Sequence, residues 1–245
     1  MEREIRLRSA QIIGRSHLLS GRNSQDALKT GSLEVRGQKV FYGVICDGCS
    51  EGESNEVGAK LASAFLGRQI EILLKQRIPL GKIPPVLHKR MFGFLKGLLG
   101  KISFDASVSR AVFIENNLLF TILGFIFTED ETIVFAQGDG VLVVNDEVTI
   151  RDENDRPNYI GYDLLKTSPT SFDVYRFPGA LVARIAIASD ALAEETDFVS
   201  ELWCNPHAVG LQRKVNILSR QEHRFRDDLS VIALEVVYDA SDSGR

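Results

Sequence analysis

The stretch VICDGCS, residues 44–50, joins an apolar run to an aspartate and a glycine. Residues 39–46, which contain that run, have the β-branched and aromatic composition of a buried strand. Asp47 therefore stands at the end of a predicted strand, a rigid mount for a side chain that faces a groove at the edge of a sheet. Glycine tolerates close approach of the backbone, so the Gly48 carbonyl oxygen can approach a metal ion beside the Asp47 carboxylate.

Length and composition bound the class of protein. The chain has 245 residues, 44% apolar and 25% charged, which is ordinary for a globular protein that buries a core without disulfides. Its net charge of −4 gives no electrostatic reason to expect nucleic acid as a partner. The N-terminus lacks the apolar segment of a signal peptide, and the longest apolar-rich run, 118–127, is too short to cross a bilayer. We expect a cytoplasmic protein without a membrane span, formed by a single domain over residues 1–238 and a disordered tail over 239–245.

The order of apolar runs and breakers predicts clustered strands interrupted by helices. The expected strands are 4–14, 26–31, 39–46, 111–115, 118–127, 131–137, 141–146, 147–152, 171–177, 184–189 and 229–237. The expected helices are 54–77, 84–99, 191–203 and a segment around 207–219, the second of them opened by a proline pair. Clustered strands without regular βαβ alternation favour an α+β layered sandwich.

Three local patterns add detail to this order. The first expected helix carries four apolar residues on one helical face: Val57, Leu61, Phe65 and Ile72. The GDG at 138–140 separates two strands and is typical of a hairpin turn. The last strand, 229–237, is apolar on both faces, which suits a central strand.

Several aspartates share one context, the start or the end of a predicted strand: Asp26, Asp47, Asp190 and Asp227, the last followed by Asp228. For any one of them alone, a turn or capping role is the more common one, and spacing leaves open whether they converge. Carboxylates that meet at one rim repel, and they are tolerated only with cations between them. Carboxylate and glycine carbonyl oxygens are hard ligands, which suit Mg²⁺ or Mn²⁺ rather than Zn²⁺.

Four groups of motifs occur in the order of a known family. They are GRSHLLSGRNSQDAL (14–28), VICDGCSEGESNEVGAKLAS (44–63), TILGFIF…FAQGDGVLVV (121–144), and the pair IAIASDAL (185–192) and RDDLSVIAL (226–234). Together they resemble the metal-dependent protein phosphatase 2C family of serine/threonine phosphatases, and within it the compact bacterial branch. The resemblance implies an α+β four-layer sandwich, in which two central antiparallel β-sheets pack face to face and α-helices flank them.

The resemblance also implies a site for two divalent metal ions, Mn²⁺ or Mg²⁺. Asp47 would bridge the two ions, and the Gly48 carbonyl would bind one of them. Asp190 and Asp227 would hold the other ion, and Asp26 would bind through water. The implied reaction is hydrolysis of phosphoserine and phosphothreonine in phosphoprotein substrates, by in-line attack of a metal-activated water. No covalent phosphoenzyme is needed, so no cysteine has to act as a nucleophile.

The chain departs from the family pattern at several positions. Many relatives have a phosphate-binding arginine where this chain has Gly21, so the neighbouring Arg22 becomes the candidate catalytic phosphate ligand, with a solvated surface role as the alternative. Many relatives have histidine where this chain has Cys49, whose thiol is a poorer acid. Ala191 stands where glycine is common, which constrains a turn but removes no ligand. His17 is expected to be a hydrogen-bonded structural residue, and the alternatives are that it orients the Gln25-Asp26 loop or touches the site.

Three alternatives stay open. A zinc site would use a C-x-x-C and a C-x-x-H: Cys46, Cys49, Cys204 and His207. A catalytically weak or dead phosphatase-like module would instead bind a phosphoprotein or regulator. Residues 68–101 contain eight Lys or Arg and one Glu, which would suit an acidic partner or an anionic membrane, although a solvated helix face is the simpler interpretation.

Overall fold

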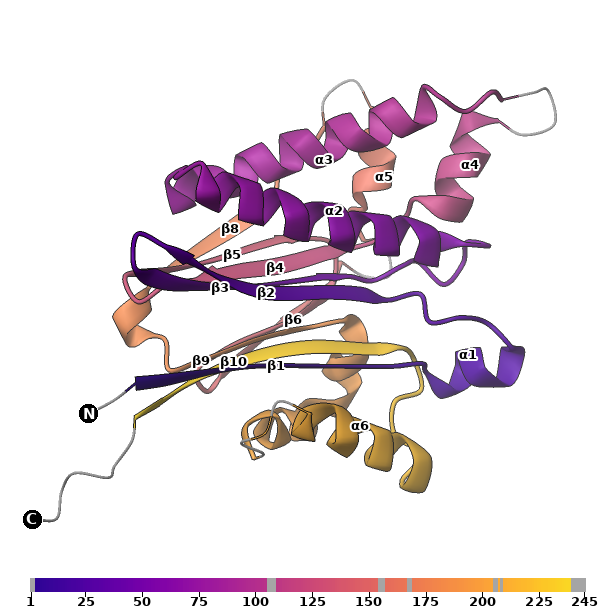
Figure 1. The fold of residues 1–245 in the computed structure, drawn as a ribbon. Coiled ribbons are helices and arrows are strands. Elements are labelled where there is room, and N and C mark those ends of the chain that lie inside the picture. The colour runs from indigo at the N-terminus through magenta and orange to yellow at the C-terminus, as the bar shows by residue number, and fades with distance from the viewer. Residues whose placement is uncertain are drawn as a thin grey trace, which may run out of the picture.

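The computed structural model of the chain describes residues 3–104, 109–153, 157–166, 169–204, 207 and 209–238. They form two five-stranded sheets that face each other, with helices on both outer sides (Figure 1). This arrangement confirms the expected four-layer α+β sandwich. The expected tail, 239–245, lies outside the described residues. None of the described helices is long and apolar enough to span a lipid bilayer.

The strands of each sheet are antiparallel throughout, and the two strand orders are β1-β10-β9-β6-β7 and β2-β3-β4-β5-β8. The first sheet consists of β1 (Arg3–Ile12), β10 (Leu229–Tyr238), β9 (Arg184–Ala188), β6 (Gly140–Val144) and β7 (Glu147–Arg151). The second consists of β2 (Ala27–Val35), β3 (Gln38–Cys46), β4 (Ile122–Phe127), β5 (Glu131–Gln137) and β8 (Asp173–Pro178). The last strand of the chain, β10, lies between two neighbours, as its two apolar faces predict.

Helices cover the outer side of each sheet (Figure 1). The second sheet is covered by α2 (Asn55–Lys75), α3 (Ile83–Leu99), α4 (Arg110–Asn117) and α5 (Ile160–Asp163). The first is covered by η3 (Asp190–Trp203), a kinked 3₁₀ segment, and by α6 (Gly210–Gln221). The short α1 (Arg15–Ser20) stands at one end of the sandwich, and two 3₁₀ turns, η1 (Leu80–Lys82) and η2 (Gly179–Leu181), complete the elements.

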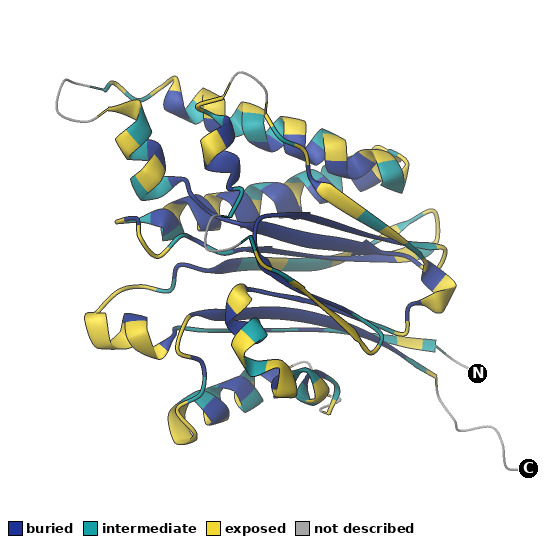
Figure 2. Cartoon of the chain, turned by 180° about the vertical axis from the view of Figure 1, so that it is seen from behind, coloured by how far each residue is buried: buried dark blue, intermediate teal, exposed yellow. Residues whose placement is uncertain are grey.

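Burial of apolar side chains holds these layers together. The sheets meet over a central cluster that includes Phe41, Ile45, Phe125 and Ile232, and two further clusters lie beneath the two helical layers. Figure 2 shows the inner strands buried, and the edge strands β7 and β8 and the outer helix surfaces largely exposed. The strand ends are therefore held rigidly, which fixes the positions of the polar residues that follow them.

The buried face of α2 differs from the apolar face noted in the sequence. Val57 is 47% exposed and Leu61 39% exposed, while the helix buries a face rich in small residues: Gly58, Ala59, Ala62, Ser63 and Gly67. Small residues allow close packing, since a Cβ at Gly58 would lie 2.4 Å from the Asn117 carbonyl oxygen. Phe65 stacks instead on Phe94 of α3, with ring centroids 4.4 Å apart.

The strand expected at 111–115 is wrong, because this segment lies within helix α4. The Ser109 side chain accepts a hydrogen bond from the Val112 backbone N–H and so caps the helix start. Within α4 only Ile114 is fully buried, so the short apolar run AVFIE forms one packed ridge of a surface helix. One apolar run of five residues does not distinguish the two structures.

The hairpin expected at 138–140 is also wrong, because β5 and β6 belong to different sheets. The GDG segment carries the chain from one sheet to the other. Gly138 has φ +87° and Gly140 has φ +142°, and a Cβ at Gly140 would lie 2.8 Å from Leu123 and 2.9 Å from the Ala188 carbonyl oxygen. The glycines are needed for this crossing, and it directs Asp139 toward the edge where other strands end.

Candidate metal centre

Four strands bring aspartates to one edge of the sandwich, two from each sheet. In the second sheet, Asp26 precedes β2 and Asp47 follows β3. In the first sheet, Asp190 lies two residues after the end of β9, and Asp227 lies two residues before the start of β10. The strands β2 and β3 are hydrogen-bonded neighbours, and so are β9 and β10. The two carboxylates of each sheet therefore start from neighbouring strands.

A pocket of about 770 Å³ opens at this edge. Its lining includes four of the five expected metal ligands: Asp47, Gly48, Asp190 and Asp227. Asp26 does not line this pocket. It is only 1% exposed and its carboxyl interacts with that of Asp47.

Burial and mutual repulsion shape the electrostatics of this pocket. Burial raises the pKa of the Asp26 carboxyl to about 8. Burial, and then the charges of Asp26 and Asp190, raise the pKa of Asp47 well above its usual range. Burial and the charge of Asp227 likewise raise the pKa of Asp190. The protein alone therefore holds these groups ionised only at a cost, and a bound cation would remove that cost.

Several buried oxygen atoms around the pocket have no hydrogen-bond partner within the described part of the chain: both carboxylate oxygens of Asp26, Oε1 of Gln25 and Oγ1 of Thr121. Buried polar atoms without a partner are uncommon in proteins, and a bound water or ion is one explanation for them. A site made of carboxylate, amide and hydroxyl oxygens fits Mg²⁺ or Mn²⁺. The residues present thus fit divalent cations.

Gly48 is shaped for close approach of its backbone. Its N–H donates to the Gln25 carbonyl at 3.2 Å, and a Cβ at this position would lie 2.8 Å from that oxygen and 3.1 Å from the Asn55 backbone. No hydrogen bond from a described residue reaches the Gly48 carbonyl oxygen. That oxygen is therefore available to a ligand in the pocket.

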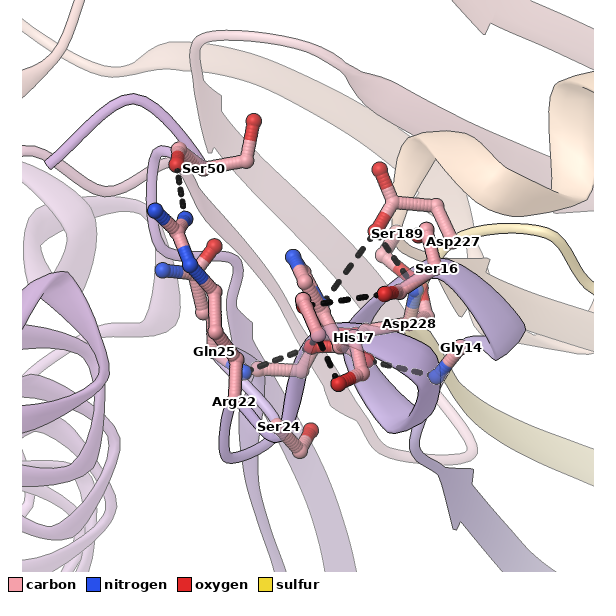
Figure 3. A network of polar contacts seen from close by, with 12 residues as sticks. Gly14, Ser16, His17, Arg22, Ser24, Gln25, Ser50, Ser189, Asp227 and Asp228 are labelled. Atoms are coloured by element: carbon pink, nitrogen blue, oxygen red, sulfur yellow. Dashed lines mark hydrogen bonds and ion pairs between the residues drawn. The ribbon is translucent and has the colours of Figure 1, made fainter.

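Asp228 ties together the segments that carry the aspartates (Figure 3). Its Oδ1 accepts a hydrogen bond from the Gly14 N–H at 2.6 Å, and its Oδ2 accepts one from the Gln25 N–H at 2.6 Å. His17 Nδ1 lies 3.0 Å from the same Oδ2 and 3.7 Å from the Asp227 carboxylate. The His17 side chain is buried and lines the pocket, and its Nδ1 has no hydrogen-bond partner among the described residues, so its role stays a prediction.

Arg22 lies beside the carboxylate pocket rather than in its lining. Its Nη1 donates to the Ser50 carbonyl oxygen at 2.6 Å, which joins the loop after α1 to the loop after Gly48 (Figure 3). It lines an adjoining groove that shares His17, Ser50 and Asp227 with the pocket. Arg22 was considered either as a phosphate ligand or as a solvated arginine. The hydrogen bond adds a third possible role, in which Arg22 links the two loops.

Four residues of this site had no predicted role in it: Asn55, Asp139, Tyr159 and Tyr162. Asp228 was noted beside Asp227, but its role as an anchor was not predicted. Asp139 lay within the quoted GDG but was treated as part of a turn; it lines the pocket, and burial raises its pKa to about 6. Asn55 is fully buried, donates to the Cys49 and Glu115 carbonyls and accepts from the Leu119 N–H. The two tyrosines reach the pocket from the α5 region, and nothing in the sequence around them indicates this.

The three cysteines do not form a site together. Cys46 is buried in β3, where burial raises its thiol pKa, and Cys204 is exposed at the end of η3. Cys49 is half-buried in the pocket lining and lies beside Tyr159, whose pKa is raised by burial and by this thiol. Among the described residues, the ligating side chains that lie mutually within 4.8 Å are His17, Asp227 and Asp228, a group without cysteine.

Known proteins resemble this chain over most of its length. The sequence profile of the family described as protein phosphatase 2C matches residues 13–229. Three solved structures cover nearly the whole chain. A bacterial serine phosphatase has 12% identity and a TM-score of 0.64, and the match covers 96% of this chain and 99% of that one. The serine/threonine phosphatase Stp1 from Staphylococcus aureus has 12% identity and a TM-score of 0.60, with 96% of each chain covered. The catalytic domain of the serine threonine protein phosphatase PstP in complex with two manganese ions has 13% identity and a TM-score of 0.61, with 97% of this chain and 100% of that one covered. At such identities the structural likeness shows the fold. Comparison with the curated proteins finds no significant match.

Proposed function

Since the chain belongs to the protein phosphatase 2C family, we propose that its carboxylate pocket removes phosphate from phosphoserine and phosphothreonine residues of proteins in a metal-dependent reaction. The observation that carries this proposal is the convergence of aspartates from both sheets on one pocket, with the buried oxygens of Asp26 left without hydrogen-bond partners. Such a set of oxygens is costly in a protein unless cations share it.

The ligands that we propose for two divalent ions, Mn²⁺ or Mg²⁺, are the following: Asp26, Asp47, Gly48, Asp190 and Asp227. Asp47 stands between the others, since the charges of Asp26, Asp190 and Asp227 all act on it, which suits a bridging role. Asp26 is buried beside it and would act through water. When bound, the ions would supply positive charge for a phosphoryl group and lower the pKa of a water.

The other residues of the pocket have separate tasks in this proposal. Arg22 stands at the mouth and keeps guanidinium N–H groups beyond the one used on Ser50, so it would hold a phosphoryl oxygen there. Tyr159 and Tyr162, with ring centroids 5.7 Å apart, form an aromatic side of the pocket against which a substrate would pack. Cys49 lies where many relatives have histidine and would be a weaker proton donor. No described feature favours the alternative of a module that only binds.

Release of phosphate tests this proposal directly. Purified protein is expected to hydrolyse para-nitrophenyl phosphate and a phosphothreonine peptide with Mn²⁺ or Mg²⁺, and to stop when EDTA removes the metal. Peptide hydrolysis separates a protein phosphatase from a small-molecule phosphatase. If neither compound is hydrolysed with either metal, or if EDTA has no effect, the proposal is wrong.

We also propose that an acidic partner binds the basic face, which we define by the exposed cations of α3 and its flanks: Lys75, Arg77, Lys82, Lys89, Lys96 and Lys101. The sequence from 72 to 104 contains no Asp or Glu, and no ion pair within the described residues involves these side chains. Three of the lysines, Lys82, Lys89 and Lys96, recur every seven residues and so follow one side of α3. Unpaired like charges along a helix favour an anionic polypeptide partner.

Binding of poly-L-glutamate, a model acidic polymer, checks this face. Affinity is expected to fall as salt is raised and to be lost in the triple variant Lys82→Glu, Lys89→Glu, Lys96→Glu. The matched control has the same net charge and carries its reversals elsewhere, at Lys39, Arg213 and Arg220. Equal loss of affinity in both triple variants would show that only net charge matters and would contradict a docking face.

A further inference from the structure

A second groove lies directly beside the carboxylate pocket. It has a volume of about 500 Å³ and shares His17, Ser50 and Asp227 with the pocket, so the two cavities adjoin. Its other walls come from α1, the start of η3 and the segment before β10. When a phosphorylated side chain of a polypeptide enters the pocket, the residues next to it in that polypeptide must lie on the surface around the pocket, which includes this groove.

Arg226 is the cation of this groove that the fold leaves without a partner. Its side chain is exposed in the groove, and no described residue forms an ion pair with it. Two other acids of η3 are engaged elsewhere, because Arg224 forms ion pairs with Glu195 and Asp197. Glu194 and Asp227 line the groove with Arg226, but within the described part of the chain neither forms an ion pair with its guanidinium.

The backbone at Arg226 is held in place, which distinguishes it from an ordinary surface arginine. Its carbonyl oxygen accepts the Ser16 backbone N–H at 3.0 Å and the Ser16 hydroxyl at 2.8 Å. These bonds attach the start of α1 to the segment that also carries Asp227. The position of Arg226 relative to the carboxylate pocket is thus fixed by the same contacts that build the pocket.

A bound metal would turn the charge balance of the groove toward an anion. Arg22 and Arg226 are its cations, and Asp227 and Glu194 are its acids. The charge of Asp227 is the one that a bound metal would neutralise, which leaves two guanidinium groups against Glu194. A planar guanidinium pairs well with a carboxylate because two N–H groups can bond its two oxygens.

We infer that this groove is a substrate subsite in which Arg226 binds an acidic side chain of the phosphoprotein, close in sequence to the phosphorylated residue. The inference rests on the proposed function and adds to it a substrate class, phosphopeptides with a nearby glutamate or aspartate. Glu194 opposes Arg226 in this subsite and limits the strength of the preference.

Peptide binding to the Mn²⁺-loaded protein tests the subsite. The probes are peptides in which a non-hydrolysable phosphonate analogue replaces phosphothreonine. One peptide has alanines around the analogue, and the others have one glutamate placed in turn at each neighbouring position. The readout is the dissociation constant, measured by fluorescence anisotropy. The best glutamate peptide is expected to bind roughly fivefold more tightly than the alanine peptide, the upper range for an exposed ion pair. This preference should decline as salt is raised.

Three variants assign the preference to its residues. Arg226→Ala should reduce the glutamate-to-alanine ratio of affinities to about one, while Arg226→Lys should keep part of it and Glu194→Gln should increase it. The control Arg213→Ala removes an exposed arginine of α6 and should keep the wild-type ratio. A ratio of one in the wild type at every glutamate position, or a wild-type ratio in Arg226→Ala, would overturn the inference. A glutamate preference in a protein that releases no phosphate would overturn the proposed function and leave the subsite standing.

Discussion

The substitution Asp47→Asn is expected to abolish phosphatase turnover while making the metal-free protein more stable. Burial and the charges of three other aspartates all disfavour the ionised form of Asp47. Removing that charge relieves repulsion, so the free energy of unfolding without metal should rise by about 1 kcal/mol or more. The same change removes the proposed bridging ligand, and kcat should fall by roughly a thousandfold or more.

Thermal unfolding with and without Mn²⁺ separates these two effects. In the wild type, Mn²⁺ at about 100 times its dissociation constant should add about 2.7 kcal/mol to the free energy of unfolding. In Asp47→Asn most of that gain should disappear even though the metal-free melting temperature is higher. The control is Asp146→Asn, an aspartate whose side chain is 96% exposed, which should behave as the wild type. Retention of the full Mn²⁺-dependent shift in Asp47→Asn would contradict its place in the metal centre.

The second large effect is expected at Asp228, a residue that touches no substrate in this account but fixes the pocket. Asp228→Ala would leave two backbone N–H groups, those of Gly14 and Gln25, buried without an acceptor. Each such group costs about 1–3 kcal/mol, so the free energy of unfolding should fall by about 3 kcal/mol. The loops that carry Asp26 and Asp227 would lose their common anchor, and the Mn²⁺ dissociation constant should rise about tenfold or more.

Asp228→Asn provides the matched control. The amide keeps one acceptor oxygen in nearly the same shape, so both the stability and the Mn²⁺ affinity should lie between those of the wild type and Asp228→Ala. Urea unfolding and titration with Mn²⁺ measure the two quantities. If Asp228→Ala is destabilised but binds Mn²⁺ as the wild type does, Asp228 supports the fold without positioning the metal ligands.

The sequence was sufficient to predict the layers and much of the pocket. Strand composition, the proline pair at the start of α3 and the doubly apolar last strand were enough to predict the main elements. The aspartates next to strands were recognisable because a strand end fixes a side chain, and four of the five predicted ligands do line one pocket. The family resemblance supplied their roles, which the residues alone left open.

The errors came from contacts between segments that are distant in sequence. Local sequence pattern could not show that the GDG segment carries the chain from one sheet to the other. This crossing places Asp139 in the pocket, whereas a hairpin turn was expected. Nor could it show that α2 packs its small residues against the sheet. Each of these depends on tertiary packing, which overrides local preference.

Diffraction from crystals grown with Mn²⁺, recorded for the anomalous signal of manganese, tests the central claim most directly. The account predicts two anomalous peaks in the carboxylate pocket, both in contact with Asp47 and one in contact with the Gly48 carbonyl oxygen. Asp190 and Asp227 should contact the other peak. The absence of a peak beside Asp47, or a single peak confined to the group formed by His17, Asp227 and Asp228, would contradict it.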